Sequence, residues 1–478
     1  MDRILKLVYS HKYIRFERPQ YLYNGIHPAL SAYLLEKSKE IGDRFNLDQE
    51  ISKVVSYNTK SNWHFTCHSN FYHYTEKFFS TSFGESSNII HADAIKNDGS
   101  IYLYPIEIRT TINEFVESFT MQLENNTYQF NFLDTIPTNV LQFLKTGLVK
   151  LIVNIIQDPC TDSKMMQLIE QMFNKTGIDG SNIIFIWGNN YQKYYSDFPK
   201  SKIKLTYGFL PLQQQAQNLS NFPRISSLGY LSDIVRESDL ELSKHNYRKR
   251  FLCFNRTMKQ HRYMLAYLAL KHNFLKDNIF SFLNLNGDET HIANSINEFV
   301  SDIDESTKYA TTIKKMIPYE IDTHHLNADE MRGFGSDNNN KEFYLNTYVH
   351  LTSETCFSEG DLKNPFFSEK TFRPIQNLQP FLFFGNPYSL QLLRELGFVT
   401  FTGFIDESYD QVEDSVKRMK LLEHEVLKIK NKTPKDMHKW YYSMKDILIW
   451  NQNHLLSFVD INPFSQVFSD INKFYANH

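Results

Sequence analysis

The chain has 478 residues, a hydrophobic fraction of 41% and a net charge of −3 at pH 7. It is too long for one ordinary core, so we expect two domains of about 200 residues each. The near-neutral charge excludes the strong positive field of a protein that binds nucleic acid through general charge alone. No apolar run approaches the roughly 20 residues that cross a bilayer, and the first residues lack a signal-peptide pattern, so we expect a cytoplasmic protein.

The N-terminal half contains a recognisable strand–helix–strand unit. A short apolar run in the first ten residues predicts a first strand. Residues 148–156 are almost continuously apolar, which is typical of a strand covered on both faces. Residues 162–173 carry apolar side chains at helical spacing, and 182–187 predict the following strand.

The C-terminal half restarts this pattern after polar stretches at 213–221 and 238–246, where we place a domain boundary. Strands are predicted at 251–254, 278–282, 346–352, 380–384 and 398–401, and helices at 261–271, 368–377 and 389–396. This strict alternation predicts an α/β fold with a parallel, doubly wound sheet.

The chain ends in a segment that predicts helices. Thr433 and Pro434 suit the N-cap and first position of a helix, and 437–458 place aromatic and aliphatic side chains on one face. We expect that face to pack back on the N-terminal domain, because it needs a second surface to bury it. The expected divisions are therefore 1–240, 245–425 and a helical segment at 426–478.

A basic turn follows the predicted strand at 251–254. It contains Asn255, Arg256, Lys259 and Arg262, so three fixed cations lie between a strand and a helix. Arginine can bind phosphate oxygens in a bidentate manner, and a helix N-terminus adds backbone donors. We interpret the turn as a phosphate clamp, with a solvated basic turn as the alternative.

A second polar group follows the strand at 346–352. Glu354 ends that strand, and Ser368, Glu369 and Lys370 begin the next helix. A carboxylate at the end of a parallel strand can accept hydrogen bonds from ribose hydroxyls. A cation is unfavourable at a helix N-terminus, so a nearby anion would explain Lys370.

These two segments, followed by the Gln-Pro-Phe-Leu-Phe-Phe-Gly sequence ending at residue 385, resemble the donor-binding domain of GT-B glycosyltransferases of the fucosyltransferase-like and exostosin-like kind. The resemblance covers about residues 248–405. It implies two Rossmann-like domains that face a cleft, a nucleotide diphosphate sugar as donor substrate, and no metal or other cofactor. It also implies donor contacts, with one residue (Asn255) shaping the turn and the others touching the ligand: Arg262, Glu354, Glu369 and Lys370.

The resemblance leaves the sugar and the base open. The spacer between Glu354 and Ser368 is long, and Arg373-Pro374-Ile375 replaces the small residues usual in this helix. A base for the acceptor would come from the N-terminal domain, and the candidates are Asp158, His64 and His91. A rival interpretation makes His64 and its neighbours a zinc site, but the spacing matches no closed tetrahedral pattern, so we expect core or acceptor-site residues instead: His64, Cys67, His68 and His73.

The sequence thus predicts a cytoplasmic glycosyltransferase that moves a sugar from a nucleotide-sugar donor to a glycan or other hydroxyl acceptor. Two alternatives remain. One is a phage-type glycosyltransferase acting on a DNA base, which the near-neutral charge does not favour. The other is a non-catalytic binding or virion protein with a GT-B-like fold.

Overall fold

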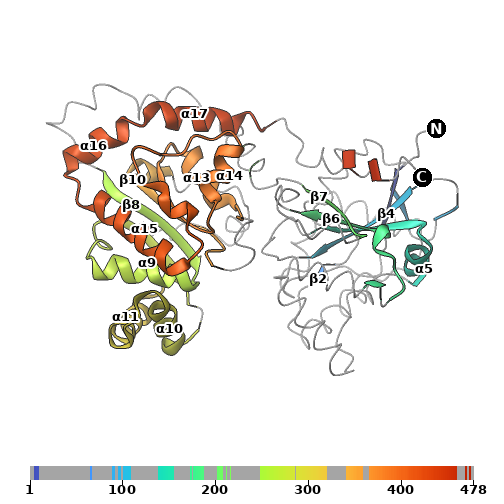
Figure 1. Ribbon diagram of the computed structural model, residues 1–478, viewed down its shortest axis with the longest axis horizontal. Coiled ribbons are helices and arrows are strands. Elements are labelled where there is room, and N and C mark those ends of the chain that lie inside the picture. The colour runs from blue at the N-terminus through green and yellow to red at the C-terminus, as the bar shows by residue number, and fades with distance from the viewer. Residues whose placement is uncertain are drawn as a thin grey trace. The chain divides into compact units, whose positions relative to one another are not determined.

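The structure is a computed structural model of the chain. It describes the C-terminal half almost continuously and the N-terminal half in part, chiefly residues 5–9, 89–91, 95–97, 101–108, 138–154, 176–187, 202–207, 248–285, 287–319, 341–358 and 365–459. The chain divides into two compact units, Met1–Leu210 with Asn462–His478, and Pro211–Ile461 (Figure 1). The division falls earlier in the chain than the predicted boundary at 240–245.

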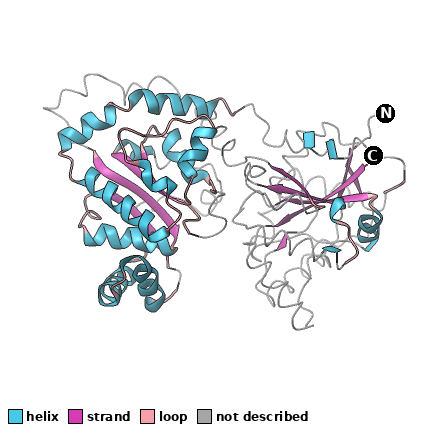
Figure 2. Cartoon of the chain, in the orientation of Figure 1, coloured by secondary structure: helices cyan, strands magenta, loops and turns pink. Residues whose placement is uncertain are grey.

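The N-terminal unit contains a largely parallel sheet (Figure 2). Its strand order is β3-β1-β4-β5-β6-β7, and the short β2 (Phe65–Thr66) pairs antiparallel to β4. The other strands are β1 (Leu5–Tyr9), β3 (Ile89–His91), β4 (Ile101–Ile108), β5 (Val149–Asn154), β6 (Ile183–Trp187) and β7 (Lys204–Tyr207). Helix α5 (Thr138–Thr146) precedes β5, and a short 3-10 turn, η5 (Gly180–Asn182), precedes β6.

The strands predicted at the chain start and around β5 and β6 are confirmed. The central residues of β5, from Leu151 to Val153, are fully buried, as expected for a strand covered on both faces. Strands β5 and β6 pair in parallel, which requires a crossover connection between them. Most of the helix predicted at 162–173 lies outside the described residues.

The C-terminal unit contains a four-stranded parallel sheet in the order β11-β10-β8-β9. Its strands are β8 (Lys249–Thr257), β9 (Ile279–Asn284), β10 (Thr347–Ser353) and β11 (Phe381–Phe384). Strands β8 and β10 pair in parallel, so the prediction for the strands near Phe251 and Asn346 is confirmed. The chain runs from β8 to one side of the sheet and later returns to the other side, which places a topological switch point between β8 and β10.

Helices connect and cover these strands. The two crossovers that leave β8 and β10 run in opposite directions, so right-handed connections place α9 and α13 on opposite faces of the sheet (Figure 1). The helices are α9 (Gln260–Lys271), α10 (Glu289–Val300), α11 (Ile303–Met316), α12 (Lys341–Leu345), α13 (Glu369–Gln376), α14 (Ser389–Glu395), the 3-10 helix η9 (Glu407–Gln411), α15 (Ser415–Lys430), α16 (Pro434–Tyr442) and α17 (Lys445–Leu456). The predicted α/β class with parallel sheets and C-terminal helices is confirmed.

One predicted strand does not form. Residues 398–401 make no ladder with the sheet, which ends at β11. Phe398 and Phe401 are nevertheless buried, because their rings pack against Phe372 and Phe381 respectively. Their aromatic character therefore reflects packing over the sheet and not membership of it.

The C-terminal helices pack on the C-terminal unit. The Tyr441 hydroxyl of α16 donates to the Leu378 carbonyl, and the Gln452 side chain of α17 donates to the Gln376 carbonyl. Helices α16 and α17 therefore cover β10 and α13 of their own unit, which offers the apolar surface they need. The segment 426–478, which was expected to pack on the N-terminal domain, divides: its helices belong to the C-terminal unit, and Asn462–His478 belongs to the N-terminal unit. Further on, Asp470 accepts a hydrogen bond from Thr206 of β7, within the N-terminal unit. Among the described residues no helix is both long and apolar enough to cross a membrane.

Gly397, which follows α14, tests how closely α17 packs against the end of that helix. Gly397 has φ of +90°, and a Cβ there would lie 2.7 Å from Nε2 of His454, which contacts the Leu396 carbonyl at 2.7 Å. Gly403 has φ of +94° and open space around it. We expect Gly403→Ala to cost about 1 kcal/mol for the left-handed backbone alone, and Gly397→Ala about 1 to 2 kcal/mol more, because His454 must move. Urea unfolding of both variants measures the difference; equal costs would contradict the His454 contact.

Candidate functional site

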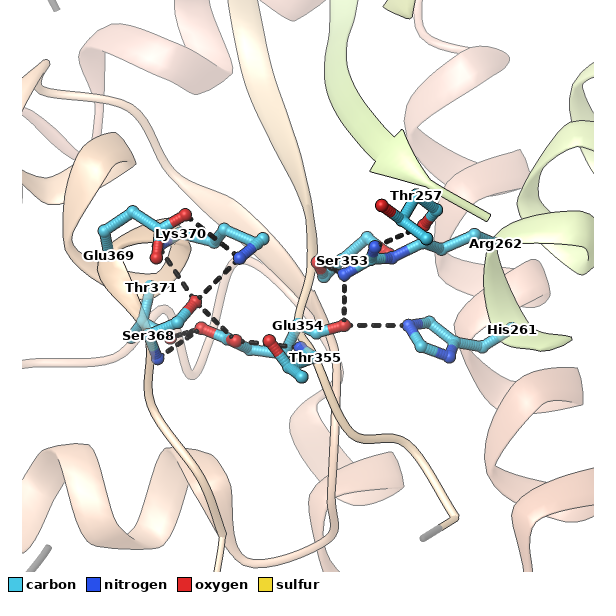
Figure 3. A network of polar contacts seen from close by, with 10 residues as sticks. All are labelled: Thr257, His261, Arg262, Ser353, Glu354, Thr355, Ser368, Glu369, Lys370 and Thr371. Atoms are coloured by element: carbon cyan, nitrogen blue, oxygen red, sulfur yellow. Dashed lines mark hydrogen bonds and ion pairs between the residues drawn. The ribbon is translucent and has the colours of Figure 1, made fainter. Parts of the chain in front are cut away.

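The switch point of the C-terminal sheet brings the two predicted segments together. The β8–α9 and β10–α13 connections leave the carboxyl ends of adjacent parallel strands, which is where ligands bind in open α/β sheets. Both α9 and α13 begin at this edge, so their positive N-terminal ends point toward it. Figure 3 shows the residues of this edge, which lie around the end of β10.

Arg262 is buried at this edge, whereas the predicted phosphate clamp needs an accessible guanidinium. Only 4% of its surface is exposed. Its Nη1 donates to the Thr257 carbonyl at 2.6 Å, its Nη2 to the Glu354 carbonyl at 2.9 Å, and its Nε to the Ser353 hydroxyl at 3.2 Å. A guanidinium engaged in this way fastens the start of α9 to the end of β10, so the predicted phosphate contact of Arg262 loses its basis.

Glu354 is completely buried at the end of β10. Its carboxylate oxygens accept four hydrogen bonds, from the Thr355 amide (3.0 Å), the Ser368 amide (3.0 Å), the Ser368 hydroxyl (2.7 Å) and the Thr371 hydroxyl (2.5 Å) (Figure 3). These donors belong to the β10 end and to the first turn of α13. The carboxylate therefore joins a strand to the helix that follows it 14 residues later.

Ser368 caps α13, as the sequence position suggests. Its hydroxyl accepts from the Lys370 amide at 3.3 Å and donates to Glu354. The Lys370 Nζ lies 3.1 Å from the same hydroxyl. The cap thus links the buried carboxylate to the lysine at the helix start.

Glu369 and Lys370 form a partly exposed ion pair. The Lys370 Nζ lies 3.0 Å from Glu369 Oε1, and the two side chains are 25% and 21% exposed respectively. Burial opposes ionisation of Glu369, but Lys370 and Arg373 outweigh it and lower the pKa of the carboxyl to about 2. Glu369 is therefore ionised at neutral pH and helps to hold Lys370 in place.

Two further cations lie on the β8–α9 connection. Lys259 occupies the N-cap of α9 and donates from Nζ to the Thr355 carbonyl at 2.9 Å. Arg256 is exposed near the end of β8. Lys259 and Lys370 thus approach the end of β10 from the two helix-bearing segments.

Asn255 lies within β8 and not in the turn that it was expected to shape. It is 1% exposed and donates from Nδ2 to the Cys253 sulfur at 3.1 Å. Its burial makes it part of the sheet interior beneath the site.

Sequence reasoning missed several residues that build this edge. His261 is buried, contacts the Glu354 carbonyl at 2.9 Å through Nε2 and stacks on Phe357. Ser353 and Thr371 also join the network. The available signal was their adjacency to predicted site residues, since each lies within one or two positions of Arg262, Glu354 or Lys370.

The structure does not place the predicted acceptor-side residues relative to this site. Asp158 and His64 lie outside the described residues, as do Cys67, His68 and His73. His91 is the last residue of β3, at the carboxyl end of a parallel strand of the N-terminal unit. In the part of the chain that the structure describes, no group of three or more histidine, cysteine, aspartate or glutamate residues is arranged to hold a metal ion.

Comparison with known proteins gives little further guidance. No family model and no curated protein matches the chain. A solved structure of a glycosyltransferase from Rickettsia africae ESF-5 matches over 100% of both chains, with 10% sequence identity and a TM-score of 0.36. A likeness of this degree does not assign a function.

Proposed function

We propose that the protein is a glycosyltransferase that binds a nucleotide diphosphate sugar at the carboxyl edge of its C-terminal sheet. The observation that carries the proposal is the convergence of Lys259 and Lys370 on the end of β10, beside two helix N-termini. Exposed Arg256 adds a third cation to the same edge. Positive side chains and helix N-termini together favour a ligand with several negative oxygens.

The position of Lys370 supports an anionic ligand. A cation in the first turn of a helix is repelled by the helix dipole, which costs a few tenths of a kcal/mol to about 1 kcal/mol. Glu369 balances the charge of Lys370. The same edge also carries Arg256 and Lys259, so its net charge stays positive without a ligand. A diphosphate would balance the remaining charge.

The chemistry of sugar transfer needs this charge. The acceptor oxygen bonds to the anomeric carbon, the bond from that carbon to the diphosphate oxygen breaks, and its electron pair stays on the diphosphate. The lysines would stabilise the charge that develops on the leaving group, which is the role fixed cations play in other phosphate sites. The acceptor's proton goes to a general base, for which Asp158, His64 and His91 stay the predicted candidates.

The experiment is a turnover assay with the full-length protein. It is incubated with a panel of uridine, guanosine, adenosine, cytidine and thymidine diphosphate sugars, and the free nucleoside diphosphate is measured. We expect release from at least one donor, by transfer to an added acceptor or by slow hydrolysis. Binding without release would favour the non-catalytic alternative, and release stimulated only by DNA would favour the DNA-base alternative. If the protein neither binds nor cleaves any of these donors, the proposal is refuted.

A further inference from the structure

We infer that Glu354 is a positioning residue that sets the distance between the two lysines of the site and does not itself contact the donor's ribose. The inference rests on the proposed function for its ligand. Its physical basis is a single residue whose side chain holds one helix start and whose carbonyl holds the other.

The side chain of Glu354 holds the start of α13. An ionised carboxylate offers about four lone-pair sites, and protein donors fill four of them. Ser368 supplies two of these donors and is also the residue that caps α13 and contacts Lys370. A movement of the Glu354 carboxylate therefore moves the helix start that carries Lys370.

The carbonyl of Glu354 holds the start of α9. It accepts from Nη2 of Arg262 at 2.9 Å and lies 2.9 Å from Nε2 of His261, and both residues belong to the first turn of α9 (Figure 3). Lys259, the N-cap of the same helix, donates to the carbonyl of Thr355, the next residue. Each lysine is thus connected to Glu354 through one intervening residue.

A ribose contact is incompatible with this arrangement. Glu354 has no exposed surface, and a ribose hydroxyl could reach its carboxylate only by displacing Ser368, Thr355 or Thr371. Displacing any of them would leave a buried donor unpaired, at a cost comparable to the hydrogen bond gained. A positioning role and a ribose contact therefore predict different affinities for a ligand that has no ribose.

The first test is the binding of inorganic pyrophosphate to the full-length protein by calorimetry. Glu354→Gln keeps the size of the side chain but turns one acceptor oxygen into a donor facing other donors. We expect it to weaken pyrophosphate binding tenfold or more, and Ser368→Ala to do the same, while Ser368→Thr retains binding because it keeps the hydroxyl. Unchanged pyrophosphate affinity in Glu354→Gln, with weakened nucleoside diphosphate affinity, would overturn the inference in favour of a ribose contact.

The control is Glu407→Gln, which alters another well-hydrogen-bonded carboxylate of the same unit. Glu407 accepts from the Phe401 amide and from the Thr400 and Thr402 hydroxyls, away from either lysine's partners. We expect this variant to lower Tm while leaving pyrophosphate affinity unchanged. An equal loss of affinity would show that Glu354 acts only through general stability and would overturn the inference.

The second test does not depend on any ligand. Amide hydrogen exchange of peptides covering 353–357 and 366–372 should accelerate about tenfold or more in Glu354→Gln, while β11 stays protected. The Thr355 and Ser368 amides bind different carboxylate oxygens, so one of them faces the new NH2 group and loses its acceptor. If Glu354→Gln does not fold, the same measurement on Thr371→Val, which removes one donor, replaces it. Unchanged exchange would overturn the positioning role, whereas faster exchange in a protein that binds no diphosphate would refute only the proposed function.

Discussion

Replacing Arg262 with alanine is expected to reduce the free energy of unfolding by about 3 kcal/mol or more. The substitution removes four hydrogen bonds, to the Ser353 hydroxyl and to the carbonyls of Thr257, Ser353 and Glu354. Ser353 and Glu354 are buried, and each buried group left unpaired costs about 1 to 3 kcal/mol. It also removes the side chain that fastens α9 to β10. Urea unfolding followed by circular dichroism measures the loss.

Arg256 supplies the matched control, because it is exposed and lies on the same connection. Arg256→Ala should change the free energy of unfolding by no more than about 0.5 kcal/mol, as surface substitutions usually do. Equal stability of the two variants would contradict the buried position of Arg262.

Acid should weaken the protein through Glu369, and a Glu369→Gln variant should escape this effect. Burial disfavours the charged carboxyl, but Lys370 and Arg373 lower its pKa from 4.5 to about 2 in the folded state. A lowered folded-state pKa stabilises the protein above the unfolded-state pKa, and this stabilisation is lost as pH falls from about 5 toward 2. Its full size is about 3 kcal/mol at most, of which roughly 1 kcal/mol should be lost by pH 3.5.

The measurement compares urea unfolding of the wild type and Glu369→Gln at pH 7 and at pH 3.5. The advantage of the wild type over the variant should shrink by roughly 1 kcal/mol at the lower pH. Other groups that titrate in this range, such as buried His350, are present in both proteins and cancel in the difference. A constant difference between the two pH values would show that the Lys370 pair does not hold Glu369 ionised.

The strands of the C-terminal sheet could be predicted because both faces of a parallel sheet are buried. All residues of β10 and β11 are buried, and their sequences contain apolar, aromatic and neutral polar residues with no lysine, arginine, aspartate or glutamate. The same apolar character misled at 398–401, where Phe398 and Phe401 bury their rings without joining the sheet. Hydrophobic pattern reports burial, and it does not distinguish a strand from a packed loop.

The site could be located from sequence, but the roles of its residues could not be assigned. The order of parallel strands brings the predicted segments together, and β10 ends within one residue of its predicted end, but β8 continues to Thr257, three residues beyond its predicted end. Which cations face the ligand depends on side-chain direction at the helix start: Arg262 turns inward to carbonyls 91 and 92 positions away, whereas Lys259 and Lys370 remain partly exposed. Such distant backbone partners leave no local pattern in the sequence.

Lys259 and Lys370 are expected to bind a diphosphate, and calorimetric titration with nucleoside diphosphates measures this binding. A charge-assisted hydrogen bond contributes about 1.5 to 3 kcal/mol, so Lys259→Ala and Lys370→Ala should each weaken binding about tenfold or more. Lys276→Ala is the control, because Lys276 is exposed on the α9–β9 connection at the opposite edge of the sheet and should leave affinity unchanged. We expect a large loss of affinity in both site variants and none in the control. Wild-type affinity in both Lys259→Ala and Lys370→Ala would contradict it.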